Sequence, residues 1–568
     1  MEEEARAIVG AIESGETTVN ELLGRLYRHG KSPDISVPKS NNKAPAAVAP
    51  EYPMGPAEDP VVAETIAHIG PHHFPSLKPK YDLVVIGAGV AGLLSVIVAK
   101  SLGKKALLVE KHYMGGDCLV VGCFPSKCVI ACARRAHELR RASDFGIKVS
   151  GTIEVDFPAV MRRMRKLRGG IAPHDGVERY LRDFCEDVAI AHASFVDAKT
   201  ILLKDSKSDA TQTVSFDKCV VAAGASAAVV PIPGLRDTPH FTNGNLFNIE
   251  ELPPRACLIG AGPIGIEMAQ ALQRFGCAVT IFEISDHLLP REDPDAAKIV
   301  TRALLDDGVD VQYSVKLHAV KLVTGTTLAY KAPWPLYRVE ATLSDGTKKT
   351  FECEALLNAT GRAPNTAGLG LDDAGIEYDS RSGIHVNDFY QTSNPDVFAA
   401  GDVCSPFKFT HAADFMGRCA VRNAFLDAKD RHSQLLVPWA TYTDPEVAHV
   451  GLYERELDAA ATPYDSYVRH LADVDRCKAE GVTTGFVKIS CAKGTDTILG
   501  ATIVGPNAGD MISEISVAIQ NGLGCGDIAG VMHPYPTSAE AVRQCAAQFL
   551  PKLRTPAVDA ALNLRMGA

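Results

Sequence analysis

The chain has 568 residues, 46% of them hydrophobic and 22% charged, and a formal net charge of -10. This length exceeds what one hydrophobic core supports, so several domains are expected. The acidic balance argues against a nucleic-acid partner, because phosphate contacts need clustered Lys and Arg. No apolar run approaches the roughly 20 residues that span a bilayer, so we expect no transmembrane segment.

The N-terminal region differs in composition from the rest of the chain. Residues 1–30 predict two short amphipathic helices, and residues 31–79 open with a proline-rich stretch typical of a linker. The first residues are acidic and lack the apolar or Arg-rich pattern of a targeting peptide. Without a cysteine or a second spaced ligand pair, we predict no metal site at the histidines of this region, His68, His72 and His73.

A glycine-rich turn follows, in YDLVVIGAGVAGLLSVIVAKSLGKKALLVEK. The pattern is an apolar strand, a G-x-G-x-x-G turn, a helix, and a second strand that ends on an acidic residue. Such glycines let the backbone approach a pyrophosphate at the helix N-terminus, and the acidic residue can bind a ribose hydroxyl. We therefore predict a dinucleotide site at Gly87, Gly89, Gly92 and Glu110.

The same unit recurs in ACLIGAGPIGIEMAQALQRFGCAVTIFEIS, with Gly260, Gly262, Gly265 and Glu283 in the corresponding positions. Two units imply two dinucleotides, and a flavin with a nicotinamide is the economical pairing. A carboxylate at Glu283 accepts hydrogen bonds from both ribose hydroxyls and repels a 2′-phosphate. We therefore expect NAD(H) as the second cofactor, with NADP(H) less favoured.

The 15 cysteines are scattered, which favours a reducing compartment, cytoplasmic or organellar, over a disulfide scaffold. One pair stands apart, in GGDCLVVGCFPSK. Cys118 and Cys123 are separated by four residues, and Pro125 lies where a helix could begin. A thiol at a helix N-terminus has a lowered pKa, and Lys127 adds a positive charge nearby. The pattern predicts a redox-active pair rather than two buried thiols.

Together these motifs resemble the FAD-dependent pyridine nucleotide-disulfide oxidoreductases, the family of dihydrolipoamide dehydrogenase, glutathione reductase and mercuric reductase. NATGRAPN, with Gly361, resembles the turn where the NAD domain returns to the flavin domain. TSNPDVFAAGDV and VAAGASAAVVPIPG resemble further FAD motifs and add Asp402 and Gly224 to the expected FAD site. IAPHDGVERY, FTHAADFMGRCAVRNA and WATYTDPEVAHVGL are most similar to the mercuric reductase-like branch.

The resemblance implies that electrons pass from the nicotinamide to the flavin and then to a Cys118–Cys123 disulfide. Cys123 matches the thiol beside the flavin, and Cys118 matches the outer thiol that exchanges with substrate. Lys127 and Glu267 match an ion pair near the flavin N5 position. A cation there stabilises the reduced, anionic flavin.

The C-terminal segment VMHPYPTSAEAV departs from the family pattern. Most disulfide-reducing members carry a histidine as acid/base, with a glutamate five residues later. Here Tyr535 replaces that histidine, Glu540 takes the glutamate position, and His533 lies two residues earlier. A phenol titrates near pH 10 and an imidazole near about 6.5, so tyrosine is the poorer base. We also expect Thr537 to cap the helix that contains Glu540.

Tyrosine at this position is similar to mercuric reductases, and the alternative is that His533 does the proton work while Tyr535 packs at a dimer interface. The chain lacks the tail cysteine pair common in mercuric reductases. Cys525 and Cys545 are the nearest candidates, and Cys545 is expected to be a buried thiol. The final electron acceptor therefore stays open.

We predict an α/β fold with two Rossmann-like dinucleotide-binding domains and a C-terminal α+β dimerisation domain. By resemblance the chain forms a homodimer, in which Tyr535 and Glu540 reach the cysteine pair of the partner subunit. The predicted boundaries are 1–30 for a helical element, 31–79 for a linker, 80–235 and 365–435 for FAD binding, 236–364 for NAD(P) binding, and 436–568 for dimerisation.

Three functions fit these patterns. The first is an NAD(P)H-dependent flavoprotein reductase of a thiol, disulfide or thiol-bound metal substrate, similar to mercuric reductase. The second is a dihydrolipoamide dehydrogenase that uses His533. The third is a flavoprotein subunit that docks onto a larger assembly through residues 1–79, where a tether would set the reach.

Overall fold

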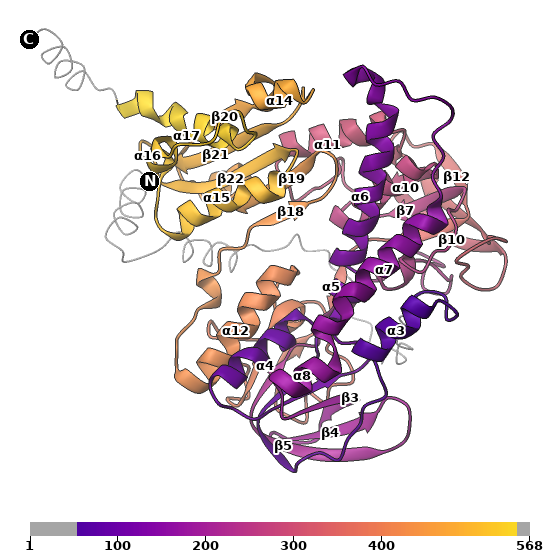
Figure 1. Ribbon diagram of the computed structural model, residues 1–568, viewed down its shortest axis with the longest axis vertical. Coiled ribbons are helices and arrows are strands. Elements are labelled where there is room, and N and C mark those ends of the chain that lie inside the picture. Colours follow the sequence, from indigo (N-terminus) through magenta and orange to yellow (C-terminus); the bar gives the residue numbers. More distant parts are fainter. Residues whose placement is uncertain (1–53, 554–568) are drawn as a thin grey trace, which may run out of the picture. The chain divides into compact units, whose positions relative to one another are not determined.

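The computed structural model describes residues 54–553 (Figure 1). The predicted helical element at 1–30 and most of the predicted linker lie outside the described residues. The chain forms two compact units. The larger unit comprises the described residues up to Leu288 and Leu304–His432. The segment Leu289–Ala303 and the described residues from Ser433 onward belong to the smaller unit.

The first sheet of the larger unit is built around a buried parallel core. Strand β1 pairs in parallel with β2 and β5, and β2 pairs in parallel with β3. The middle of β1 is fully buried, as expected for the near-continuous apolar run of a parallel strand. The sheet has the order β1-β2-β3-β4-β5-β17, with β1 (Lys80–Ile86), β2 (Ala106–Glu110), β3 (Asp187–Phe195), β4 (Thr200–Asp205), β5 (Thr211–Val221) and β17 (Val397–Ala399).

A second parallel sheet in the larger unit has the order β13-β7-β8-β9. Its strands are β7 (Arg255–Ile259), β8 (Ala278–Phe282), β9 (Asp310–Gln312) and β13 (Ala355–Asn358). Between β9 and β13 in sequence lies an antiparallel sheet of β10 (Lys316–Thr324), β11 (Leu336–Thr342) and β12 (Lys348–Cys353). Two small ladders complete the described strands of this unit: β6 (Ala225–Ala227) with β14 (Arg362–Pro364), and β15 (Tyr378–Asp379) with β16 (Gly383–Ile384).

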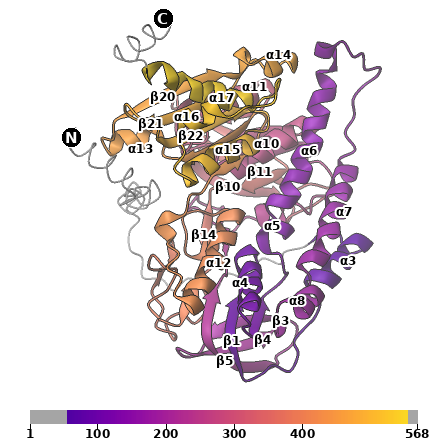
Figure 2. The same ribbon diagram turned by 60° about the vertical axis from the view of Figure 1, so that its left-hand side comes forward.

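Two helices of the larger unit begin directly after the glycine turns, and two more begin within the cysteine motif. Helix α4 follows β1 and packs against α12, and α10 follows β7. The long helices α6 and α7 lie side by side, and α3 packs along α7 (Figures 1 and 2). Their bounds are α3 (Pro60–Ile69), α4 (Val90–Ser101), α5 (Gly116–Val120), α6 (Cys123–Arg140), α7 (Phe157–Asp175), α8 (Val177–Asp183), α9 (Asn243–Leu246), α10 (Pro263–Phe275) and α12 (Thr410–Leu426).

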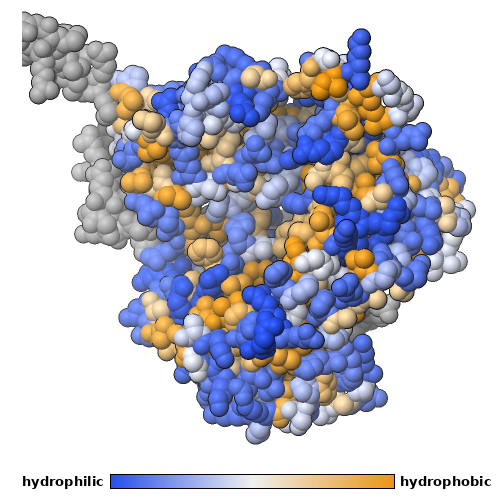
Figure 3. Space-filling model, viewed as in Figure 1, coloured by the Kyte–Doolittle hydropathy of each residue, from blue (hydrophilic) through white to orange (hydrophobic). Residues whose placement is uncertain are grey.

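The stretch Gly116–Arg140 is long and apolar enough to cross a membrane when judged by length and composition. Core helices of folded proteins meet the same criterion, so the finding does not decide the expectation that the chain has no transmembrane segment. The stretch consists of α5 and α6, which carry the cysteine motif and pack against α7 and α10. This packing buries part of its apolar surface. The end of α6 and the loop that follows expose an apolar surface of Leu139, Phe145, Ile147 and Val149 (Figure 3).

The smaller unit is an antiparallel sheet with helices, the α+β pattern expected for the C-terminal domain. Its strand order is β18-β19-β22-β21-β20. The strands are β18 (Trp439–Thr441), β19 (Glu446–Gly451), β20 (Tyr464–His470), β21 (Phe486–Ala492) and β22 (Ile498–Gly505). The helices are α13 (Glu454–Ala459), α14 (Asp475–Ala479), α15 (Ala508–Gln520), α16 (Cys525–Gly530) and α17 (Glu540–Ala546), and α11 (Pro294–Asp306) begins in the Leu289–Ala303 segment.

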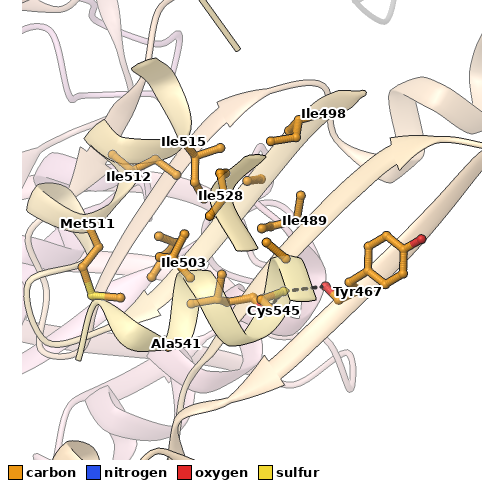
Figure 4. Packing of buried hydrophobic residues seen from close by; sticks show 14 of the residues in the cluster. Tyr467, Ile489, Ile498, Ile503, Met511, Ile512, Ile515, Ile528, Ala541 and Cys545 are labelled. Atoms are coloured by element: carbon orange, nitrogen blue, oxygen red, sulfur yellow. Dashed lines mark hydrogen bonds between the residues drawn. The ribbon is translucent and has the colours of Figure 1, made fainter. Parts of the chain in front are cut away.

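Aliphatic side chains from β21, β22 and α15 form the core of the smaller unit, including Ile489, Ile503 and Ile515 (Figure 4). Cys545 lies in this core, fully buried, with its Sγ 3.3 Å from the backbone oxygen of Tyr467. The expectation that Cys545 is a buried thiol is confirmed. A thiol in this position is shielded from any solute outside the fold.

The prediction that Thr537 caps the helix containing Glu540 was wrong. Helix α17 begins at Glu540, and Thr537 lies before it in a turn. The Thr537 hydroxyl donates instead to the backbone oxygen of Pro534, at 2.8 Å. This local turn satisfies the side chain that would otherwise cap a helix.

A buried lysine joins the two segments of the smaller unit. Lys488 on β21 is 8% exposed, and its Nζ lies 2.8 Å from Asp293 Oδ2, 3.2 Å from Asp295 Oδ2 and 3.6 Å from Glu454 Oε2. Burial alone would lower the pKa of Lys488, but the hydrogen bond to Asp293 and the surrounding carboxylates raise it. The lysine therefore stays charged inside the fold.

Replacing Lys488 with methionine should lower the free energy of unfolding by about 3 kcal/mol, because it leaves the buried Asp293 carboxylate without its cation. Urea unfolding of the full-length protein measures this change. The matched control is Lys493→Met, at an exposed lysine just beyond the end of the same strand, with an expected change within about 0.5 kcal/mol. Equal losses in the two variants would show that the buried ion cluster does not stabilise this unit.

Candidate active site

The first glycine turn has a tightly constrained backbone. Gly87 has φ +103°, and a Cβ added to Gly92 would lie 1.8 Å from the carbonyl oxygen of Gly87. At Gly89, just before α4, an added Cβ would meet its nearest heavy atom only at 3.9 Å. The helix N-terminus is thus open toward a ligand, while Gly92 holds the turn closed. Glu110 accepts a hydrogen bond from the Ala88 amide at 2.8 Å.

The second glycine turn repeats this geometry. Gly260 has φ +100°, and a Cβ added to Gly265 would lie 2.2 Å from the Gly260 carbonyl oxygen. A Cβ at Gly262 would meet no heavy atom within 4 Å. Glu283 accepts from the Ala261 amide at 2.8 Å, as Glu110 does from Ala88. Each turn therefore fits a dinucleotide pyrophosphate at a helix N-terminus, with a carboxylate at the end of the next strand.

The first turn is accompanied by other groups expected at an FAD site. Asp402 lies in a single 3-10 turn, Gly401–Val403, and its Oδ2 is 3.4 Å from the Arg362 Nε. Burial raises the pKa of Asp402, although Arg362 opposes this shift. Gly224 and Gly361 have positive φ, and an added Cβ at either would meet no atom within 4 Å. These open, polar surroundings also fit a nucleotide.

Cys118 and Cys123 are brought together by two consecutive helices. Cys118 is the third residue of α5, and Cys123 is the first residue of α6. The hydrogen bond with Cys123, followed by burial, raises the pKa of the Cys118 thiol well above its usual range. The same bond lowers the pKa of Cys123, with further lowering from Thr410 and Lys127. The pair is thus polarised, with Cys123 as the thiolate and Cys118 as the protonated thiol.

Two contacts from distant parts of the sequence complete this environment. The Cys123 Sγ lies 3.3 Å from the Thr410 Oγ1, at the first residue of α12. Lys127, on α6, forms an ion pair of 2.9 Å with Glu267, which is buried on α10. The sequence paired Lys127 with Glu267 through the resemblance. It did not single out Thr410, although FTHAADF was among the motifs compared.

The predicted proton carriers lie in the smaller unit. Both ring nitrogens of His533 have local partners, Nδ1 with the Val531 oxygen at 3.0 Å and Nε2 with Glu514 at 2.8 Å. Tyr535 is 69% exposed, and its hydroxyl donates to Asp475 at 3.0 Å.

Glu540, expected beside Tyr535, is buried and accepts a hydrogen bond from Arg543 at 2.9 Å. The Tyr535 hydroxyl donates to Asp475 and not to Glu540. The described chain therefore shows no hydrogen bond between these two predicted partners.

Comparison with known proteins agrees with this geometry. The family described as Pyridine nucleotide-disulphide oxidoreductase matches residues 81–417, and its dimerisation domain matches residues 437–546. A mercuric reductase of Lysinibacillus sphaericus is 31% identical over 499 residues, which cover 88% of this chain and 86% of that protein. A dihydrolipoyl dehydrogenase of Geobacillus stearothermophilus is 32% identical over 478 residues, 82% of this chain and 95% of that protein.

Solved structures show the same fold. LpdA from Mycobacterium tuberculosis has a TM-score of 0.73 and 25% identity, covering 83% of this chain and all of that one. The flavoprotein disulfide reductase RclA from Escherichia coli, solved as a Cu(II) complex, has a TM-score of 0.72 at 24% identity, with 83% of this chain covered and 100% of RclA. The similarity to RclA shows a shared fold and nothing more.

Two nucleotide turns, a polarised cysteine pair and a C-terminal α+β unit define a flavoprotein disulfide oxidoreductase. The chain belongs to the pyridine nucleotide-disulphide oxidoreductase family. Members of this family bind FAD and use NAD(P)H. The match to the dimerisation domain supports a homodimer. The predicted α/β fold class and cofactor class are confirmed, whereas the boundaries between the predicted FAD and NAD(P) domains remain a prediction.

Proposed function

We propose that the chain passes electrons from NADH through FAD to the Cys118–Cys123 disulfide and on to a thiol-bound metal ion such as Hg(II), or to another thiol- or disulfide-type substrate. The observation that carries this proposal is the polarised cysteine pair, which joins a low-pKa thiol to a protonated exchange thiol. The relatives of similar length include mercuric reductases and dihydrolipoyl dehydrogenases. The substrate is therefore the open question.

The residues of the glycine turns have distinct roles in this proposal. Gly87, Gly89, Gly92, Glu110 and Asp402 would hold FAD, which supplies a hydride acceptor and a two-electron donor when bound. The second turn would hold the nicotinamide dinucleotide, with Glu283 at the adenosine ribose. A carboxylate there disfavours a 2′-phosphate, which supports NADH as the donor.

Three groups of the site act on Cys123. The α6 N-terminus and the Thr410 hydroxyl stabilise its thiolate, and Lys127 contributes a positive charge. The buried Glu267 carboxylate holds the Lys127 ammonium in place at 2.9 Å. We assign to this ion pair the cationic environment that favours a reduced flavin.

Cys118 would then exchange with the substrate. With a disulfide substrate, Cys118 gives up its proton and attacks one sulfur as the thiolate. The substrate S–S bond breaks, and the departing thiolate takes up a proton and leaves as one thiol. Cys123 next attacks the Cys118 sulfur, releases the second thiol and re-forms the Cys118–Cys123 disulfide. With a thiol-bound soft metal ion, thiolate ligands of the protein replace those of the carrier before the two electrons reach the metal.

A dihydrolipoamide dehydrogenase is the second candidate, favoured by the 32% identity to a protein of that name. It requires His533 as the base, yet both nitrogens of that ring already have partners. Tyr535, exposed in the smaller unit, is a weaker base for a dithiol. We therefore rank the metal-ion substrate first. Tyr535 and Glu540 would reach the cysteine pair of the partner subunit in the homodimer.

The discriminating experiment is anaerobic NADH oxidation by the purified holoprotein with thiol-bound Hg(II), lipoamide or glutathione disulfide as the acceptor. We expect fast turnover with Hg(II) and at least about 10²-fold slower turnover with lipoamide, because the phenol replaces an imidazole base. The control is Cys118→Ala, which should abolish the reaction with each acceptor. Faster turnover of lipoamide than of Hg(II) would instead assign the dehydrogenase function.

Failure of all three acceptors would favour the third predicted function, in which the N-terminal region docks onto a larger assembly. If NADH reduces the flavin while all three acceptors fail, a role as a subunit docked through residues 1–79 becomes the better proposal. Deletion of these residues should then change the size of the native complex and leave flavin reduction unchanged.

A further inference from the structure

The segment of residues 54–70, which we call the N-terminal brace, is hydrogen-bonded to the chain just before the helix that carries Cys118. The Met114 amide, two residues before α5, donates to the backbone oxygen of Ile69 at 2.8 Å. Ile69 is the last residue of α3 and is fully buried. The approach to the cysteine motif is therefore fixed against the end of α3.

Arg168 of α7 connects the other end of α5 to the same brace. Its Nη1 donates to the backbone oxygen of Val120, the last residue of α5, at 2.8 Å, and its Nη2 donates to the backbone oxygen of Met54. The last carbonyls of a helix lack partners within the helix and carry partial negative charge, so a cation is favourable there. Cys118, the third of the five residues of α5, thus lies between two hydrogen-bonded ends.

The guanidinium of Arg168 is buried without a carboxylate partner. Its side chain is 1% exposed, and within the described part of the chain it bonds only to the two backbone oxygens, while its Nε has no hydrogen-bond partner. Burial lowers the pKa of Arg168 to about 10, which still leaves it charged at neutral pH. An aliphatic side chain would fill this site without the cost of burying a charge. The two carbonyl groups that its planar fork holds explain the arginine better.

The brace is also held on α7 by contacts of its own. Helix α3 packs along α7 (Figures 1 and 2). Asp59, the residue that caps α3, forms an ion pair of 2.8 Å with Arg165 of α7. A Cβ added to Gly169 would lie 2.9 Å from the Thr65 Oγ1, so the two helices approach closely at this point. One helix therefore holds the brace and reaches from it to α5.

We propose that Arg168 is a positioning residue for Cys118: by tying α5 to the N-terminal brace, it keeps Cys118 in hydrogen-bond contact with Cys123. The inference rests on the proposed function, because it takes these two thiols as the reacting pair. The brace precedes residues 81–417, the part of the chain that matches the family, so it adds a support outside that part. A misplacement of about 1 Å caused far from the reacting atoms can slow a reaction by about 10²-fold.

The pH dependence of Cys123 alkylation tests the position of Cys118. The hydrogen bond from Cys118 is the largest of the causes that lower the pKa of Cys123. Arg168→Met should weaken this bond and raise that pKa, so less Cys123 is thiolate at neutral pH. We expect labelling at neutral pH to be about tenfold slower, which corresponds to one pKa unit, and to slow less than in Cys118→Ala.

The labelling needs no turnover. The full-length holoprotein is reduced with dithiothreitol, freed of it under anaerobic conditions and treated with iodoacetamide, and fragmentation of the labelled peptide by mass spectrometry distinguishes Cys123 from Cys118. The matched control is Lys166→Met, at an exposed cation on the same helix α7, which should leave the labelling midpoint unchanged.

Turnover gives a second readout in the same variants. In Arg168→Met, NADH should reduce the flavin at the parent rate, whereas kcat for NADH-dependent reduction of DTNB should fall by about 10-fold or more. Arg168→Lys should recover part of both losses, because an ammonium group can donate to one carbonyl but lacks the planar fork that holds two. A general weakening of the fold would instead slow flavin reduction as well.

Asp59→Asn loosens the brace without a change to Arg168. Asparagine caps a helix about as well as aspartate, so the substitution removes the ion pair with Arg165 and keeps the cap of α3. It should slow Cys123 labelling in the same direction as Arg168→Met and by a smaller factor. The double variant should lose less than the product of the two single losses, because both substitutions act on one support.

The outcomes separate this inference from the proposed function. If Cys118→Ala keeps full turnover, the proposed exchange is wrong, yet slower labelling in Arg168→Met would still support the positioning of Cys118. Parent labelling in both Arg168→Met and Asp59→Asn would show that the brace does not position Cys118. Loss of flavin in both variants would show that the two residues support the whole fold, and this result would also overturn the proposal.

Discussion

A protein with Gly92 replaced by alanine should be purified without flavin. The added Cβ would lie 1.8 Å from the carbonyl oxygen of Gly87, and a backbone atom cannot turn away as a flexible side chain can. Either α4 shifts or the turn opens, and both remove the geometry that presents the helix N-terminus to a pyrophosphate. We expect a destabilisation of about 3 kcal/mol in addition to loss of the cofactor. Flavin absorbance per protein and urea unfolding measure the two effects.

The second turn offers an internal comparison. In Gly265→Ala the added Cβ would lie 2.2 Å from the Gly260 carbonyl oxygen, so this variant should keep its flavin but no longer be reduced by NADH. Gly170→Ala is the control, because Gly170 is exposed within α7 and an added Cβ meets no atom within 4 Å. The Gly170→Ala substitution should leave the free energy of unfolding unchanged or raise it by about 0.5–1 kcal/mol. Flavin retention in Gly92→Ala, or flavin loss in Gly265→Ala, would show that the two sites are assigned wrongly.

These turns were predictable because their geometry is local. Each turn is specified by three glycines within six residues, a strand before them and a carboxylate at the end of the next strand. Residues with a side chain cannot readily adopt the backbone conformation of such a turn. Both turns have the predicted strand-turn-helix form. In each of them the structure adds a hydrogen bond that was not predicted, from Ala88 to Glu110 and from Ala261 to Glu283. The cysteine motif is equally local, since Cys123 begins a helix where Pro125 suggested one.

Features that depend on distant contacts were not predictable in the same way. Thr410 lies 287 residues from Cys123 in the sequence, and only the folded sheet and helices bring their side chains to 3.3 Å. The predicted cap at Thr537 failed for the opposite reason: the motif was present, but a local turn took its hydroxyl.

The cysteine pair should behave as one unit in mutagenesis. Cys118→Ala, Cys123→Ala and the double variant should each lose turnover of thiol-type acceptors by a factor on the order of 10³ or more, with losses that do not add. Flavin reduction by NADH should persist in all three variants. Cys132→Ala, a half-buried thiol on the same helix α6, serves as the control and should keep full turnover. Additive losses would mean that the two thiols act in separate steps.

Cys123 should also report on its neighbours through the pH dependence of its alkylation. Its pKa is lowered first by the hydrogen bond from Cys118, then by Thr410 and then by the charge of Lys127. Each deletion therefore raises the pKa, so the alkylation midpoint should move to higher pH in the order Cys118→Ala, Thr410→Val, Lys127→Met, and less thiolate remains at neutral pH. If Lys127→Met moved the midpoint most, the positive charge rather than the hydrogen bond from Cys118 would be the main support of the thiolate. In that case the charge of Lys127 would polarise the cysteine pair, and exchange of Cys118 with substrate would leave the pKa of Cys123 little changed.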